Sequence, residues 1–150
     1  MAVTVSGLFL PTFIDIFDLT QLAVDFDAET HKLALFSNSI TPNFSTDTAY
    51  GVSPYASNEV TGTNWSAGGV ALTGTTVSES PTGSLMWDAT DVSVAATTLT
   101  GARCALLYAN ALAGKNAICL VNFGADYSTV NGTFGIVWAA AGVFALDLTP

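Results

Sequence analysis

RCALLYAN (residues 103–110) begins a series of three apolar segments that continues with AICLVNF (117–123) and TFGIVW (133–138). Val, Ile, Leu, Cys and aromatic residues dominate all three, which is typical of β-strands. The connections at 110–116 and 130–133 have the length and the Asn and Gly residues of hairpin turns. We therefore expect residues 101–148 to form an antiparallel meander, with a fourth strand at 143–148.

Short apolar segments also alternate with turn residues upstream of this meander. We expect strands at 31–37, 70–78, 85–87 and 92–94. Residues 38–63 are rich in Ser, Thr, Asn and Pro and predict a long ordered loop, anchored by its aromatic residues. Many short strands separated by turns predict a mainly β fold, an antiparallel sandwich or small barrel. A chain of 150 residues has the length of a single domain.

The first twenty residues contain the only convincing helical spacing. Phe9, Phe13, Ile16 and Phe17 fit one helical face, and Pro11 suits the first turn. We therefore expect a short N-terminal helix. It either packs on the chain's own sheet or docks on another subunit.

The composition excludes several classes of function. Only 10% of the residues are charged, against about 25% in a typical globular domain, which suits a protein whose faces are covered by neighbours. A net charge of −9 excludes capture of a phosphate backbone, so no nucleic-acid partner is expected. No apolar segment approaches the ~20 residues that span a bilayer, and the N-terminus lacks the basic region of a signal peptide. We expect synthesis in the cytoplasm and no membrane partner.

No group of residues indicates catalysis, a metal or a cofactor. Asp25, Asp27 and Glu29 alternate like the start of a calcium loop, but the Gly and the distant Glu of that loop are missing, so a turn is expected. His31 is the only histidine and has no local Ser or Cys partner. Asp88 and Asp91 fit turn caps better than a pair of sugar-cleaving carboxylates. The sequence predicts a protein that is not an enzyme.

Two further features have structural interpretations. Cys104 and Cys119 lie on neighbouring expected strands; we expect buried thiols, although a favourable register would allow a disulfide. Arg103 begins an apolar strand, where an unpaired guanidinium is costly, so an ion pair with Asp88 or Asp126 is expected.

Four stretches, taken in order, resemble a family of small structural proteins of tailed bacteriophages. The stretches are the N-terminal helical segment with the strand at 27–36; Glu59-Val60, Gly62 and WSAGGVAL at 65–72; Ala102-Arg103 through LYAN at 107–110; and LVNFG at 120–124 with NGTF at 131–134. The third resembles that family's strand of an arginine, an apolar run and Tyr-Asn. The fourth resembles a strand ending in Asp-Phe-Gly or Asp-Tyr-Gly, although Asn122 stands where the acid is expected.

The resemblance implies a virion component on the capsid surface. In the most direct version it is a head decoration or cement protein that bridges capsid subunits. Its expected partners are the major capsid protein and further copies of itself, with which it forms a dimer or trimer. The alternative is a tail or fibre component that binds a receptor or glycan, with Tyr50, Tyr55, Trp65 and Trp87 stacking on sugars. In either version the family motifs are packing and turn residues, so we expect structural roles for Trp65, Gly68, Gly69, Arg103, Tyr108, Asn131 and Gly132.

The N-terminal twenty residues carry more apolar surface than one side of a short helix can bury on its own sheet. We therefore expect this segment to lie at an interface, either within a homo-oligomer or against the capsid, and the loop at 38–63 to lie near a second one. The expected interface residues are Val3, Val5, Leu8, Phe9, Phe13, Phe44, Tyr50 and Tyr55.

Overall fold

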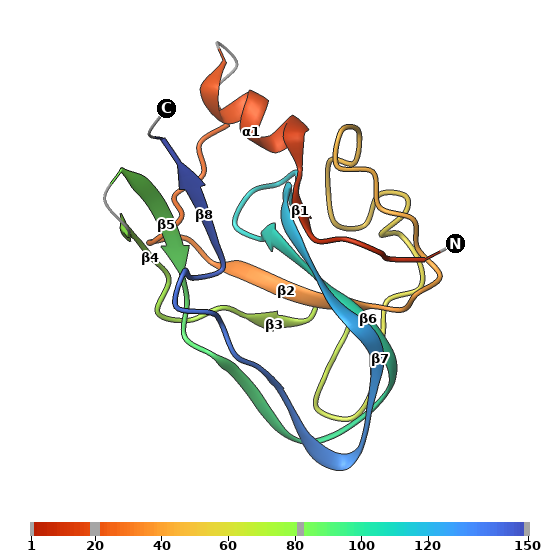
Figure 1. The fold of residues 1–150 in the computed structure, drawn as a ribbon. Coiled ribbons are helices and arrows are strands. Elements are labelled where there is room, and N and C mark those ends of the chain that lie inside the picture. Colours follow the sequence, from red (N-terminus) through yellow and green to blue (C-terminus); the bar gives the residue numbers. More distant parts are fainter. Residues whose placement is uncertain (1, 19–21, 81–82, 149–150) are drawn as a thin grey trace.

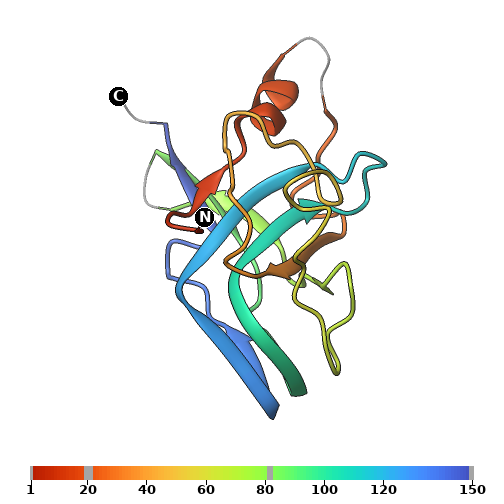
Figure 2. The same ribbon diagram turned by 90° about the vertical axis from the view of Figure 1, so that its right-hand side faces the viewer.

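A computed structural model describes residues 2–18, 22–80 and 83–148 (Figures 1 and 2). The chain is mainly β, with 49% strand and 6% helix in two antiparallel sheets, which confirms the predicted fold class. The elements are β1 (Gly7–Leu8), α1 (Leu10–Phe17), β2 (His31–Phe36), β3 (Val70–Ala71), β4 (Thr76–Glu79), β5 (Ser84–Asp88), β6 (Val92–Ala109), β7 (Ala117–Ile136) and β8 (Phe144–Asp147). The first sheet has the order β1-β7-β6-β2-β3 and the second the order β4-β5-β8.

The centre of the larger sheet is buried on both faces. Leu33 and Leu35 of β2 belong to the apolar cluster on one face, together with Trp87 of the smaller sheet. The intervening residues Ala34 and Phe36 belong to the cluster on the other face, which the N-terminal segment and the long loop cover. Side chains alternate between the faces of a strand, so burial on both sides requires an uninterrupted apolar sequence. This explains the run ALLYA in β6, whose residues also alternate between the two clusters.

Strands β6 and β7 form one long hairpin, whose pairing extends from Tyr108 opposite Ala117 to Val92 opposite Ile136. The connection at 110–116 is the expected hairpin turn. Far from that turn the register shifts several times, and Ala96, Gly101, Gly124 and Asn131 adopt positive φ, which bends the two strands back on themselves (Figure 1). We call residues 96–101 and 124–132 the ribbon end. It lies at the opposite end of the molecule from α1 in both views.

The predicted meander at 101–148 is wrong. Residues 117–123 and 133–136 belong to one strand, β7, and Asn131-Gly132 lies within it rather than in a hairpin turn. The polar stretch stays in the ladder because hydroxyl groups pair across it: the Thr97 and Thr129 hydroxyls lie 2.8 Å apart, and Thr97 donates to the carbonyl of Gly132 at 3.0 Å. The expected fourth strand exists as β8, but it pairs with β5 in the other sheet.

Two other expected strands also change. The segment 92–94 is the start of β6 and not a separate strand. The segment 70–78 divides into β3 and β4, which belong to different sheets. In contrast, β2 and β5 lie where strands were expected, and the long loop at 38–63 is confirmed, with Ile40, Ala49, Tyr55 and Val60 buried.

Gly69 allows the segment that precedes β3 to approach β2 closely. It has a φ of +68°, and a Cβ there would collide with the carbonyl of Leu33. Gly101 has a similar φ of +70°, yet nothing lies within 4 Å of its Cβ position. A comparison of substitutions at the two glycines therefore distinguishes the cost of a left-handed backbone from the cost of a collision with β2.

We expect Gly101→Ala to lower the free energy of unfolding by about 1–2 kcal/mol, the cost of left-handed backbone with a side chain. Gly69→Ala should cost clearly more, since β2 must also move. Urea titrations of both variants measure the difference. Equal losses of unfolding free energy in the two variants would show that β2 can move away from residue 69 without a measurable cost.

Candidate docking surfaces

The first residues of the chain belong to its own core. Val3 and Phe9 are fully buried. The Val3 amide donates to Asn38 at 2.8 Å, its carbonyl accepts from Arg103 at 3.2 Å, and the Phe9 ring packs against Phe44 with centroids 5.2 Å apart. The expectation that Val3 and Phe9 contact a partner is therefore corrected, because both contact groups of their own chain. Val5 is exposed, and Leu8 is half-buried in β1.

Helix α1 packs through the side that carries Thr12 and Phe13. Thr12 is buried and its hydroxyl donates to the carbonyl of Ala117. Phe13 packs against Phe26 and Phe144, with ring centroids 6.4 and 5.9 Å away. Pro11 lies in the first turn, where its missing N–H removes no helical hydrogen bond. Phe13 is therefore mostly engaged within the chain.

The opposite side of α1 is apolar and exposed. Leu10, Ile14 and Phe17 are 51%, 50% and 79% exposed. Their spacing of four and three residues places them on one side of the helix. We call these three residues the helix ridge. Exposed apolar residues grouped in this way mark contact sites more often than scattered ones do.

The aromatic residues of the long loop fasten it to the body. Tyr55 is buried and its hydroxyl donates to Asp47 at 3.2 Å, so the expectation that it contacts a partner is also corrected. Tyr50 stacks on Tyr108 at 4.5 Å and donates to Glu59 at 2.9 Å. Burial, followed by the Glu59 carboxylate, raises the pKa of Tyr50 to about 12. Phe44 is half-buried against Phe9.

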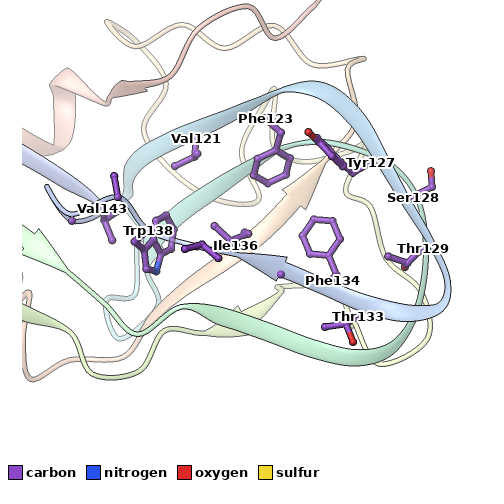
Figure 3. A pocket seen from close by; sticks show the side chains of 14 residues that line it. Val121, Phe123, Tyr127, Ser128, Thr129, Thr133, Phe134, Ile136, Trp138 and Val143 are labelled. Atoms are coloured by element: carbon purple, nitrogen blue, oxygen red, sulfur yellow. The ribbon is translucent and has the colours of Figure 1, made fainter.

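The bent part of β7 and the segment after it enclose a hollow of about 640 Å³ (Figure 3). Phe123 and Phe134 lie toward one end, and Trp138 and Val143 lie at the other. All the residues that line it are uncharged: Val121, Phe123, Tyr127, Ser128, Thr129, Thr133, Phe134, Gly135, Ile136, Val137, Trp138, Ala139, Gly142 and Val143. This uncharged hollow and the helix ridge are two apolar surfaces of the described part of the chain.

The residues expected to be structural lie in internal contacts. Tyr108 donates to the carbonyl of Gly68 at 2.8 Å, and the Gly68 amide donates to Glu59 at 2.7 Å. Trp65 is fully buried against Phe134, with centroids 5.5 Å apart. Asn131 donates its amide to Thr98 at 3.1 Å in the bend of β7, next to Gly132.

The sugar-stacking aromatics of the receptor alternative are not available as surface platforms. Trp65, Trp87 and Tyr55 are at most 2% exposed. The Trp87 indole donates to the carbonyl of Phe26 at 2.8 Å. In the hollow, Tyr127 is 51% exposed and Trp138 is partly exposed.

Arg103 forms an ion pair with Asp126, which is one of the two partners expected for it. The guanidinium lies 3.4 Å from the carboxylate and donates a second bond to the carbonyl of Val3. Arg103 thereby links β6 both to β7 and to the N-terminal segment.

His31 is a packed core residue. Its Nε2 lies 2.9 Å from the Asp25 carbonyl, which can only accept, so Nε2 carries the hydrogen. Its ring lies 5.3 Å from Trp87, and its Nδ1 has no hydrogen-bond partner within the described part of the chain. Burial lowers the pKa of His31 below its ordinary value of about 6.5. A neutral ring bonded to a carbonyl is not the nucleophile–base pair of a catalytic triad.

The acidic segment before β2 forms the expected turn. Asp25 accepts from the amides of Asp27 and Ala28, as in an Asx-turn. The hydrogen bond between the two side chains lowers the pKa of Asp25 and raises that of Asp27. Across residues 2–18, 22–80 and 83–148, no three metal-ligating side chains gather.

Both cysteines are free and buried, which confirms the preference for thiols over a disulfide. Cys104 faces one apolar cluster and Cys119 the other, so the sheet separates them. Burial raises the pKa of each thiol to about 12. The described helix is too short to cross a membrane.

No family model, curated protein or solved structure is significantly similar to this chain. The resemblance to phage structural proteins is therefore carried by the sequence motifs alone.

Sequence reasoning missed Leu10, Ile14 and the hollow. The helical spacing from Leu10 to Phe17 is as regular as the one from Phe9 to Phe17, and nothing in it shows which side packs. The hollow arises from a bend of β7 that looks like a turn in the sequence.

We expect Arg103→Ala to lower the free energy of unfolding by about 1–3 kcal/mol, because a charge-assisted bond to a carbonyl is lost. Asp126→Ala should cost less than about 1 kcal/mol, since its carboxylate is 53% exposed. Thermal and urea unfolding of both variants test this order. Equal effects would mean that the link to Val3 contributes nothing.

Stability should fall with pH below about 6.5. The unfolded chain then binds a proton at its single His, whereas the folded chain, with its lowered His31 pKa, does not. The loss is at most ~1.4 kcal/mol per pH unit. Urea titrations at pH 7.5, 6.5 and 5.5 should show a steeper decline for the wild type than for His31→Gln. Parallel declines would assign the effect to carboxylates.

Proposed function

We propose that this protein is a structural component of a tailed-phage virion that decorates the outer surface of the head and bridges capsid subunits. The support comes from the family resemblance of its motifs, the 10% content of charged residues and the arrangement of its exposed apolar side chains. Its partners are the major capsid protein and further copies of itself. The role requires no catalytic residue, metal or cofactor.

The observation that carries the proposal is the position of two exposed surfaces, the apolar helix ridge and the mainly polar ribbon end with its exposed Val130. The helix ridge lies at one end of the molecule, and the ribbon end lies at the other (Figures 1 and 2). A subunit that bridges others needs at least two separate contact surfaces. Repeated over a shell, individually weak contacts of this kind combine into strong attachment.

The ribbon end is the better surface for the shell. Val130 is 87% exposed there, and its neighbours are mainly small and uncharged. Within the described residues, β1 pairs with β7 only at Cys119 and Leu120, so the outer edge of β7 beyond Asn122 has no neighbouring strand. Such an edge offers backbone hydrogen bonds to a strand of another protein.

A tail or fibre component that binds a glycan is the alternative. Tyr127 and Trp138 favour it, because partly exposed rings in an uncharged hollow are suitable stacking surfaces for sugars. Labelled antibodies on intact particles separate the two: copies over the whole head support decoration, whereas copies confined to one vertex support the tail.

Charges placed on the ribbon end should prevent attachment to the shell. We expect Val130→Asp with Thr100→Asp to reduce binding to purified shells that lack this protein at least about tenfold, because buried unpaired charges cost more than ~1.4 kcal/mol. Co-sedimentation measures the occupancy.

Val52→Asp is the matched control, since Val52 is 51% exposed in the long loop, outside both surfaces. It should bind shells as the wild type does. Full binding by the ribbon-end variant would show that the shell contact lies elsewhere.

A further inference from the structure

The uncharged hollow stands out on an otherwise acidic chain. Twelve Asp and Glu residues give a net charge of −9, yet none of them lines the hollow. A second copy that docks here meets no acidic side chain in the lining, although Asp91 lies next to it, where its carboxylate accepts from the Trp138 amide at 2.9 Å. The hollow is therefore a surface where another copy can dock with little electrostatic repulsion.

We propose that the helix ridge of one copy seats in the uncharged hollow of a second copy, so that copies join head to tail. Leu10, Ile14 and Phe17 are the three anchors. An amphipathic helix in an apolar groove is a common docking mode, and it uses anchors at this spacing. The inference needs no shell and stands independently of the proposed function.

The ridge cannot fill the hollow of its own chain. The Phe9 amide donates to Ile118 at 3.0 Å, the Leu10 amide donates to Phe44 at 2.8 Å, and Thr12 is bonded to Ala117. These bonds fix the start of α1 beside the turn between β6 and β7. The hollow includes residues of the ribbon end, at the far end of the same hairpin. Occupation therefore requires another molecule.

The dimensions and charges of the two surfaces agree. A hollow of about 640 Å³ lies in the range of pockets that bury a drug-sized ligand, so it has room for the three side chains of the ridge. The helix also carries Asp15, half-buried beside the ridge, which an acidic hollow would repel and an uncharged one accepts.

The geometry also fixes the kind of assembly. Ridge and hollow are different surfaces, so each contact leaves one ridge and one hollow unoccupied, and growth continues into a ring or an open chain. A two-fold dimer through one shared surface would instead stop at two copies.

The test uses two variants whose changes lie on exposed positions. Ile14→Ser with Phe17→Ser removes the ridge; Val137→Asp with Ala139→Asp introduces charge at the rim of the hollow, where both residues are exposed. Val52→Asp is again the control, and circular dichroism checks that each variant is folded. Sedimentation is followed from about 10 µM to about 1 mM, where small interfaces associate.

The average mass of the wild type and of Val52→Asp should rise with concentration beyond that of a dimer, and each variant alone should stay monomeric. A mixture of the two variants should form dimers and nothing larger, because only one intact ridge and one intact hollow remain to pair. Monomeric wild type over the whole range would overturn the proposal. A mixture that stays monomeric while the wild type assembles would also overturn it, in favour of a different contact.

Cross-linking gives a second, independent readout. Cys104 and Cys119 are buried, so they give little background reaction. A Phe17→Cys copy mixed with a Val137→Cys copy should form a disulfide-linked heterodimer under mild oxidant, at least about tenfold faster than a Phe17→Cys copy mixed with a Val52→Cys copy. Equal rates would mean that the ridge does not seat in the hollow.

Discussion

Burial of β2 and β6 on both faces is the constraint on which the rest of the fold depends. A sheet whose centre is apolar on both sides must be covered twice. The smaller sheet covers one face with Trp87, and the N-terminal segment and the long loop cover the other with Phe9 and Tyr55. Removing either layer would expose a large apolar area to water, at a cost in folding free energy of ~25 cal/mol per Å². The N-terminal segment and the long loop, which were expected to lie at interfaces, thus cover one face of the core.

Strands were predicted correctly from the sequence where the local pattern of apolar residues and turn residues is sufficient to define them. The segment from His31 and the hairpin at 110–116 were found because their apolar residues and turn residues leave few alternatives. Residues 130–133 were misinterpreted as a hairpin turn, since Asn and Gly are typical of turns. Their strand depends on the contact between Thr97 and Thr129, residues 32 positions apart. Such long-range pairing has no local sequence signal.

The sequence predicted which segment carries the exposed apolar surface, the N-terminal helix, but not which of its residues form that surface. The N-terminal helix does carry an exposed apolar surface, yet its members are Leu10 and Ile14 rather than Phe9. Phe9 and Tyr55 were expected at an interface and lie inside, because the burial of aromatic rings contributes strongly to the core. Which side of α1 faces outward depends on Thr12, whose hydroxyl reaches the carbonyl of Ala117. A helical spacing alone does not contain that information.

Charge and contact size together suggest how copies would assemble on a shell. Acidic copies repel one another over a Debye length of about 8 Å at physiological salt, and a ridge of three side chains forms a small contact. Both effects keep free copies apart when they are dilute. On a shell, attachment through the ribbon end would hold neighbours at millimolar effective concentration, where a weak ridge-to-hollow contact becomes occupied. The low affinity of each contact then prevents premature assembly, and the lattice provides the strength that a single pair lacks.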